Sequence, residues 1–137
     1  MAGYSGTPLP KKLGIKPQFR VLLQDVSADV SAELKHALAG CQLLKDGSGP
    51  LDFAMVFVKS RADLQKNFGK VARQLAPAGI LWIGWPKKAS GVATDLNENE
   101  VRRIGLQAGL VDVKVCAIDE TWSGLKFVIR LKDRAKD

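Results

Sequence analysis

The sequence predicts a three-layer α/β fold in which a mostly parallel sheet ends in an antiparallel hairpin. Residues 21–23, 53–58 and 80–85 form continuous apolar segments, which are typical of strands covered on both faces. Between them, apolar residues recur at helical spacing, so strands and helices alternate along the chain. Two late segments alternate apolar with other residues, as strands with one wetter face do. Strands separated by helices pair in parallel through right-handed crossovers, and the late pair supplies the hairpin.

An arm over residues 1–19 is predicted to carry one short helix. Thr7 as the capping residue, proline at the next position and Gly14 just past the end predict a helical turn. Leu9 and Leu13 are four residues apart, so both would face the interior.

The α/β core is predicted over residues 20–131. Residues 20–25 form its first strand, and Ser27 or Asp29 then begins a helix. Residues 41–44 are a candidate short strand, followed by a loop rich in turn-forming residues.

The second half of the core continues the pattern. Ser60 begins a helix after the second apolar strand, and the turn-forming residues 76–79 stop it. Asn97 and Glu100 form a capping-box pattern for the next helix. Residues 119–124 then allow a hairpin between the last two strands.

Length and composition indicate one domain that spans residues 1–137 and ends in a basic tail, residues 132–137. The 137 residues are 46% hydrophobic, which suffices for a single core. No apolar run approaches the roughly 18 residues of a membrane span, and the N-terminus lacks the apolar stretch of a secretory signal. We therefore expect a soluble, cytoplasmic protein with no membrane partner.

Cysteine and histidine usage predicts neither a metal site nor a catalytic group. Cys41 and Cys116 lie far apart in apolar surroundings, so buried free thiols are expected. With His36 they make no metal-ligand spacing. No motif places a nucleophile near His36, which is interpreted as an ordinary helix histidine.

The charge favours polyanions only weakly. The chain has 21 Lys and Arg against 14 Asp and Glu, a formal charge of +7. These cations are dispersed along the sequence, without an arginine-rich tract, so any nucleic-acid binding would consist of non-specific phosphate contacts.

The apolar segments resemble the successive strands of class I S-adenosylmethionine methyltransferases, a Rossmann-like fold whose sheet also ends in an antiparallel hairpin. The segments that carry this resemblance are LGIKPQFRVLLQD, LDFAMVFV, LAPAGILWIGWPK, GLVDVKV and LKFVIRL. The resemblance implies a methyltransferase-like but truncated fold.

A closer resemblance is to a family of small bacterial proteins of unknown function. Its members share an opening such as GYSGTPLPKKLGIK, here residues 3–16, and a late Trp-Ser-Gly segment, here residues 122–124. This resemblance implies no activity.

The turn after the first strand argues against a bound adenosyl cofactor. Asp25 provides an acidic residue there, but residues 26–30 contain no glycine. A cofactor held at that turn needs bare backbone to approach its phosphate or ribose. Asp46 is a candidate acidic ribose partner only if residues 41–44 form a strand. We therefore predict no cofactor and lean against an enzyme.

Residues that follow the parallel strands should gather at one edge of the sheet, where ligands of such folds bind. The helix beginning at Ser60 would add free backbone N–H groups that favour an anion. The candidate ligand-binding residues are Asp25, Ser27, Lys59, Ser60, Arg61, Trp85, Lys87 and Lys88.

Three tryptophans divide into one core residue and two candidates for exposure. Trp82 should be core, whereas Trp85 and Trp122 are candidates for exposure. Trp122, in the hairpin loop, is the candidate for contact with a partner, and a tryptophan folded back over its own hairpin is the alternative.

Three hypotheses of function remain. The leading one is a non-enzymatic α/β module, able to self-associate as a homo-oligomer, that presents a basic strand-end edge to an anionic small molecule or protein partner. The second is an atypical S-adenosylmethionine-dependent enzyme related to methyltransferases. The third is a non-specific nucleic-acid-binding accessory protein.

Overall fold

The computed structural model describes residues 7–45 and 49–134. Within them, six strands form one sheet in the order β2 (Gln42–Leu43), β1 (Arg20–Gln24), β3 (Leu51–Phe57), β4 (Leu75–Pro86), β6 (Trp122–Ile129), β5 (Leu110–Ala117). The pairs among β2, β1, β3 and β4 are parallel, and β6 runs antiparallel to both β4 and β5. The predicted mixed sheet with its terminal antiparallel hairpin is confirmed.

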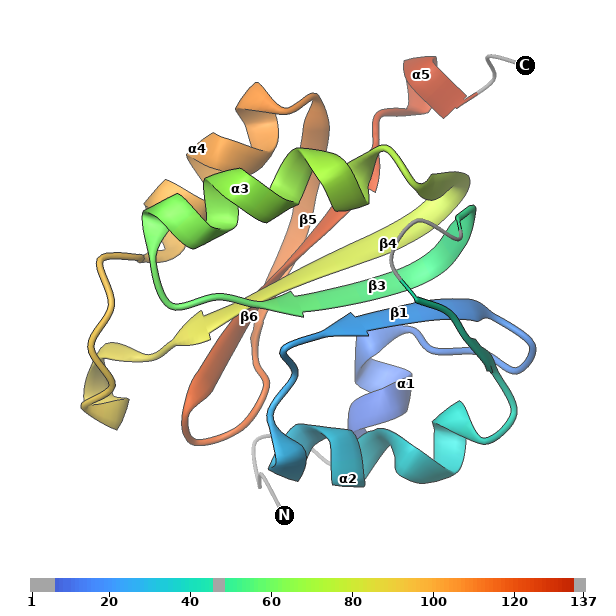
Figure 1. Ribbon diagram of the computed structural model, residues 1–137, viewed down its shortest axis with the longest axis horizontal. Helices are drawn as coiled ribbons and strands as arrows, with labels where there is room; N and C mark the ends of the chain where they lie inside the picture. Colours follow the sequence, from blue (N-terminus) through green and yellow to red (C-terminus); the bar gives the residue numbers. More distant parts are fainter. Residues whose placement is uncertain (1–6, 46–48, 135–137) are drawn as a thin grey trace.

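Helices cover both faces of the sheet, which gives the predicted three layers (Figure 1). One face carries α3 (Arg61–Ala72) and α4 (Glu98–Gln107), and the other carries α1 (Leu9–Leu13) and α2 (Ala28–Leu38). A large apolar cluster fills each of the two interfaces. A short 3₁₀ helix, η1 (Lys88–Ser90), follows β4, and α5 (Leu131–Arg134) ends the described chain, taking up part of the predicted basic tail.

The order of the strands creates a switch point between β1 and β3. The chain places β2 on one side of β1 and then crosses to the other side to form β3 and β4. The loops that follow β1 and β3 therefore diverge to opposite faces of the sheet at this point. Ligands of open α/β sheets bind outside the carboxyl ends of the strands at such a position.

Helix α1 is anchored to the sheet through Trp82. The indole N–H of Trp82, which is fully buried, donates to the backbone carbonyl of Leu13 at 2.8 Å. Leu9 and Leu13 are buried, as predicted. The expected cap is wrong, because Pro8 rather than Thr7 occupies the N-cap position.

Residues 76–79 do not form the predicted helix stop. They belong to β4, and α3 ends before them at Ala72. The pairing of β4 with β3 shifts register between Leu51 and Phe53, so this part of β4 is irregular and accommodates Pro77. Gly79 is required there, because a Cβ would lie 2.6 Å from the carbonyl oxygen of Leu51.

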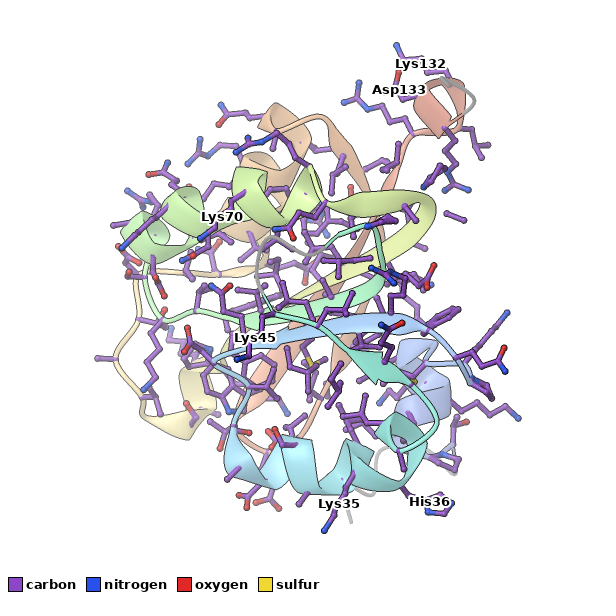
Figure 2. All side chains as sticks on the ribbon, turned by 45° about the vertical axis from the view of Figure 1, so that its right-hand side comes forward. Lys35, His36, Lys45, Lys70, Lys132 and Asp133 are labelled. Atoms are coloured by element: carbon purple, nitrogen blue, oxygen red, sulfur yellow. The ribbon has the colours of Figure 1, made fainter. Side chains whose placement is uncertain are left out.

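Charged side chains lie on the outside of several elements rather than on one patch. Figure 2 shows Lys35 and His36 on α2, Lys70 on α3 and Lys132 on α5. This distribution agrees with the dispersed charge of the sequence. No helix in residues 7–45 and 49–134 has both the length and the apolar character that crossing a bilayer requires.

Candidate functional site

A cavity of about 420 Å³ opens at the carboxyl ends of β1 and β3, at the switch point of the sheet. Asp25 and Ser27 line it from the turn after β1, and Lys59 lines it from the turn after β3. The other lining residues come from the end of β3, the first turn of α3 and the start of β6: Phe57, Val58, Asp63, Trp122. The structure thus brings together four of the predicted candidates, Asp25, Ser27, Lys59 and Trp122.

Two of these side chains carry charge that the described part of the chain does not neutralise. Asp25 and Lys59 are exposed, and neither makes a hydrogen bond or ion pair with another described residue. Asp25 also has a left-handed backbone, with φ of 58°. Aspartate tolerates this conformation better than most residues, and it allows the abrupt turn from β1 into α2.

A polar network positions the second carboxylate of the cavity. The side-chain amide of Asn67 donates to Oδ1 of Asp63 at 3.0 Å and to the backbone carbonyl of Asp63 at 2.8 Å. Gln24, at the end of β1, donates to Oδ1 of Asn67 at 2.9 Å. Because the network spans β1 and α3, it fixes the carboxylate of Asp63 beside the cavity.

Trp122 forms the aromatic wall of this cavity with Phe57. The two ring centroids lie 4.4 Å apart at an interplanar angle of 35°. Trp122 is only 8% exposed, so its expected exposure is wrong. Asp119 fixes the start of the strand, since its Oδ1 accepts the backbone N–H groups of Thr121 and Trp122 at 2.8 Å each. Trp122 therefore packs inward against the end of β3.

A second cavity of about 670 Å³ lies beside the first, between the end of β4 and the segment that leads to α4. Trp85, Lys87 and Lys88 line it, and Ser123, next to Trp122, contributes from β6. Trp85 is 5% exposed, so its expected exposure is also wrong. The predicted edge therefore divides into two cavities, separated by the start of β6.

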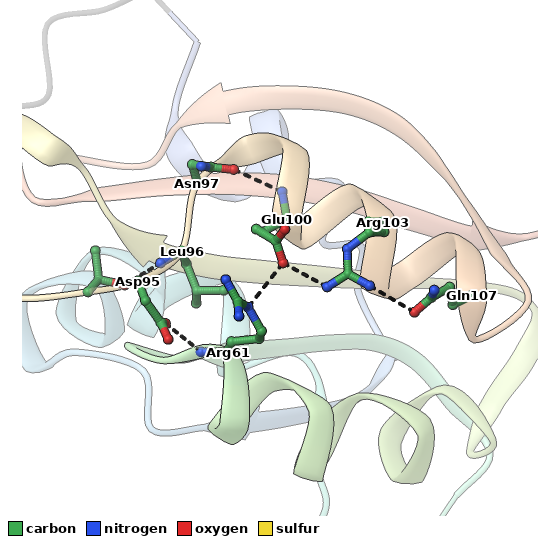
Figure 3. Close-up of polar contacts among 8 residues, drawn as sticks. Arg61, Asp95, Leu96, Asn97, Glu100, Arg103 and Gln107 are labelled. Atoms are coloured by element: carbon green, nitrogen blue, oxygen red, sulfur yellow. Dashed lines mark hydrogen bonds and ion pairs between the residues drawn. The ribbon is translucent and has the colours of Figure 1, made fainter.

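Arg61 takes no part in either cavity but joins α3 to α4 (Figure 3). Its Nε lies 3.1 Å from Oε1 of Glu100, which also accepts from Arg103 at 2.7 Å. Hydrogen bonding from Arg103 is the main cause that lowers the pKa of Glu100, and the charges of Arg103 and Arg61 lower it further. Arg61 thus has a structural partner.

The start of α3 already holds a carboxylate. Oδ1 of Asp95 accepts the backbone N–H of Arg61 at 2.7 Å, and Oγ of Ser60 accepts that of Asp63 at 3.0 Å. Ser60 is therefore the cap that the sequence predicts. The expected free N–H groups at Arg61 and Asp63 are engaged, so the chain supplies its own anion there.

The strand-end edge is charge-balanced rather than basic. Three lysines line the two cavities, together with four carboxylates, Asp25, Asp63, Asp95 and Glu98. Sequence reasoning missed Asp63, Asp95 and Glu98 as parts of the site. The position of Asp63 in the first helical turn was a usable signal, whereas Asp95 lies in a segment whose path the sequence does not define.

Other reactive side chains lie away from both cavities. His36 is exposed on α2. Cys41 and Cys116 are free but half-buried rather than buried, and burial raises the pKa of Cys116. The described residues contain no group of three or more potential metal ligands. Asp46, the conceivable ribose partner, lies outside the described residues.

The turn after β1 is short and carries side chains throughout. Asp25, Val26 and Ser27 alone connect β1 to α2, and Ser27 caps the helix by accepting the backbone N–H of Val30 at 3.3 Å. Every residue of this turn has a Cβ, so the backbone is not bare where a bound dinucleotide or adenosyl group would approach it.

Solved structures of similar fold include methyltransferases and a pre-rRNA processing protein. Magnesium protoporphyrin IX methyltransferase from Synechocystis with bound SAH is 12% identical, with a TM-score of 0.57 over 89% of this chain and 78% of that chain. A TehB-like SAM-dependent methyltransferase from Corynebacterium glutamicum is 10% identical, with a TM-score of 0.54 over 94% and 91%. The fibrillarin pre-rRNA processing protein of Methanococcus jannaschii is 14% identical, with a TM-score of 0.55 over 93% and 71%.

These likenesses establish a methyltransferase-like, Rossmann-like fold. A comparison with curated proteins finds no match. The family described as "Protein of unknown function (DUF3052)" matches residues 11–131, which include every described strand and the whole of α2, α3 and α4. The chain belongs to this family.

Proposed function

We propose that this protein is a non-enzymatic binding module whose ligand occupies the cavity at the carboxyl ends of β1 and β3. The observation that carries the proposal is the pair of charged side chains there, Asp25 and Lys59, which lack partners among the described residues. The volume of about 420 Å³ lies in the range of small-molecule sites. The position is the one where open α/β sheets bind ligands.

The lining residues define the chemistry of the ligand. Lys59 would bind an anionic group, while Asp25 and Asp63 would accept hydrogen bonds from hydroxyl or amino groups. The ring of Trp122, which packs at a tilt against Phe57, offers an apolar surface. We infer a small polar molecule that carries both an anion and several donors.

Native mass spectrometry of the purified protein tests this proposal. Wild-type protein should retain a bound small molecule, and Lys59→Ala and Asp25→Asn should lose most of it. Asparagine tolerates the left-handed backbone of position 25, so Asp25→Asn removes the charge without disturbing the turn. Lys66→Ala is the matched control, because Lys66 is an exposed lysine of α3 outside the cavity.

Equal retention of the molecule in the cavity variants and the control would contradict the proposal. The proposal would also be contradicted if wild-type protein carried no bound molecule and its tryptophan fluorescence did not change on addition of millimolar phosphorylated and zwitterionic metabolites.

The second candidate, an S-adenosylmethionine-dependent activity, is supported by the fold alone. We expect isothermal titration calorimetry to detect no saturable S-adenosylmethionine binding at micromolar concentrations, because side chains occupy the whole turn from Asp25 to Ser27. Saturable binding in this range would replace the non-enzymatic proposal with the enzymatic one.

A further inference from the structure

Two lysines lie directly opposite each other on the β5–β6 hairpin. Lys114 of β5 is paired in register with Lys126 of β6, and Lys126 is paired in turn with Trp82 of β4. Residues paired in this way share one face of the sheet. Because Trp82 packs against α1, both lysines lie on the face that α1 and α2 cover, away from α3 and α4.

No described carboxylate neutralises this pair. Neither lysine takes part in any of the ion pairs of the described residues. Asp112 is close in sequence, but the register shift between Asp112 and Lys114 puts it opposite Phe127, where Nε of Arg102 donates to it at 2.9 Å. Burial lowers the pKa of Lys126, and the charge of Lys114 lowers it further.

A third lysine approaches the same strand from α1. The ammonium group of Lys12 donates to the backbone carbonyl of Ala117, the last residue of β5, at 3.0 Å. Three elements, α1, β5 and β6, therefore bring three cations to one face of the hairpin.

Like charges directly opposite each other on neighbouring strands destabilise a sheet. An anion bound between Lys114 and Lys126 would reverse that penalty, because both of these ammonium groups would then face opposite charge. We propose that Lys12, Lys114 and Lys126 form a binding site for the phosphate or diphosphate group of a small molecule. This site is separate from the cavity beside β1 and β3.

The neighbouring residue row suggests what else the ligand could carry. Ile80, Val128 and Val111 are paired across β4, β6 and β5 next to the lysine row, and all three are half-buried. A ligand whose diphosphate carries an apolar chain would cover this row, whereas free diphosphate would contact only the lysines. Comparing the affinities of the two ligands shows whether the site prefers free diphosphate or a diphosphate that carries an apolar chain.

Calorimetry and thermal unfolding with diphosphate test the site in full-length Lys114→Gln and Lys126→Gln variants. Wild-type protein should bind diphosphate and melt at a higher temperature in it than in chloride of equal ionic strength. Each variant should bind about tenfold more weakly, since one charge-assisted contact is lost. Without ligand, each variant should melt above wild type, because the repulsion between the lysines is gone.

Two controls separate this proposal from the cavity proposal. Lys66→Gln, on α3, should change neither measurement, and Lys59→Ala should leave diphosphate binding intact. A tighter complex with geranyl diphosphate than with free diphosphate would identify an amphiphilic ligand.

Three results would overturn the proposal. The first is a wild-type protein that does not bind diphosphate. The second is an unchanged diphosphate affinity in the Lys114 and Lys126 variants. The third is diphosphate binding that depends on Lys59 instead. The last would assign diphosphate to the cavity between β1 and β3.

Discussion

Gly105→Ala should lower the free energy of unfolding by about 1–3 kcal/mol, the usual cost of forcing extra atoms into a packed core. Gly105 is buried in α4, and a Cβ there would lie 2.1 Å from Cε1 and 2.4 Å from Cζ of Phe127. Phe127 cannot move aside easily, because it is fully buried and packs edge-to-face on Phe68 at 5.2 Å. The added methyl group would therefore push α4 away from the sheet.

Gly69→Ala is the matched control in α3. Its Cβ would meet only Nη1 of Arg73, at 3.2 Å, the end of an exposed flexible side chain. Alanine favours a helix interior over glycine by up to about 1 kcal/mol, so this variant should be as stable as wild type or more stable. Urea unfolding of both variants measures the contrast. Equal effects on the two helices would mean that α4 does not pack on Phe127 as described.

Periodicity and capping residues predicted the elements of this fold because each signal is local. Ser27, Ser60 and Asn97 each accept a backbone N–H three residues ahead, as their positions in the sequence suggest. The prediction failed at residues 76–79, where turn-forming residues lie within a strand. There the irregular pairing of β4 with β3, a long-range feature, accommodates Pro77 and Gly79, which local propensity disfavours in a strand.

The candidate site was predicted less completely because it depends on contacts between distant segments. The carboxyl ends of β1 and β3 meet as expected, so Asp25 and Lys59 line one cavity. Arg61 is 34 residues from Asp95, and their hydrogen bond can only be known from the path of the intervening chain. The balance of charges at the strand-end edge of the sheet depends on such contacts, so composition does not predict it.

The tryptophans illustrate the same limit. The sequence makes Trp85 and Trp122 candidates for exposure, yet both are buried, one in each of the two apolar clusters. Trp122 packs on Phe57, from a strand more than sixty residues earlier in the chain. Burial of a residue at a strand end depends on what covers that end, which local sequence does not encode.

Trp82→Phe should cost about 1–3 kcal/mol more than Trp85→Phe, although the two substitutions delete the same atoms. Trp82 donates its indole N–H to the carbonyl of Leu13 at 2.8 Å, whereas the indole of Trp85 makes no hydrogen bond to a described residue. Phenylalanine at position 82 would leave that carbonyl without its partner in a buried site, which is the costly case for hydrogen bonds.

The loss of stability in Trp82→Phe should be concentrated in α1. A helix of five residues does not persist without tertiary packing, and the Trp82 hydrogen bond is its buried polar attachment to the sheet. Hydrogen exchange should therefore accelerate at the amides of Lys12 and Gly14, which donate to Pro8 and Pro10, more than at the amides of α4. Equal stabilities of the two variants, with unchanged exchange in α1, would show that apolar packing of Leu9 and Leu13 is sufficient to hold this helix.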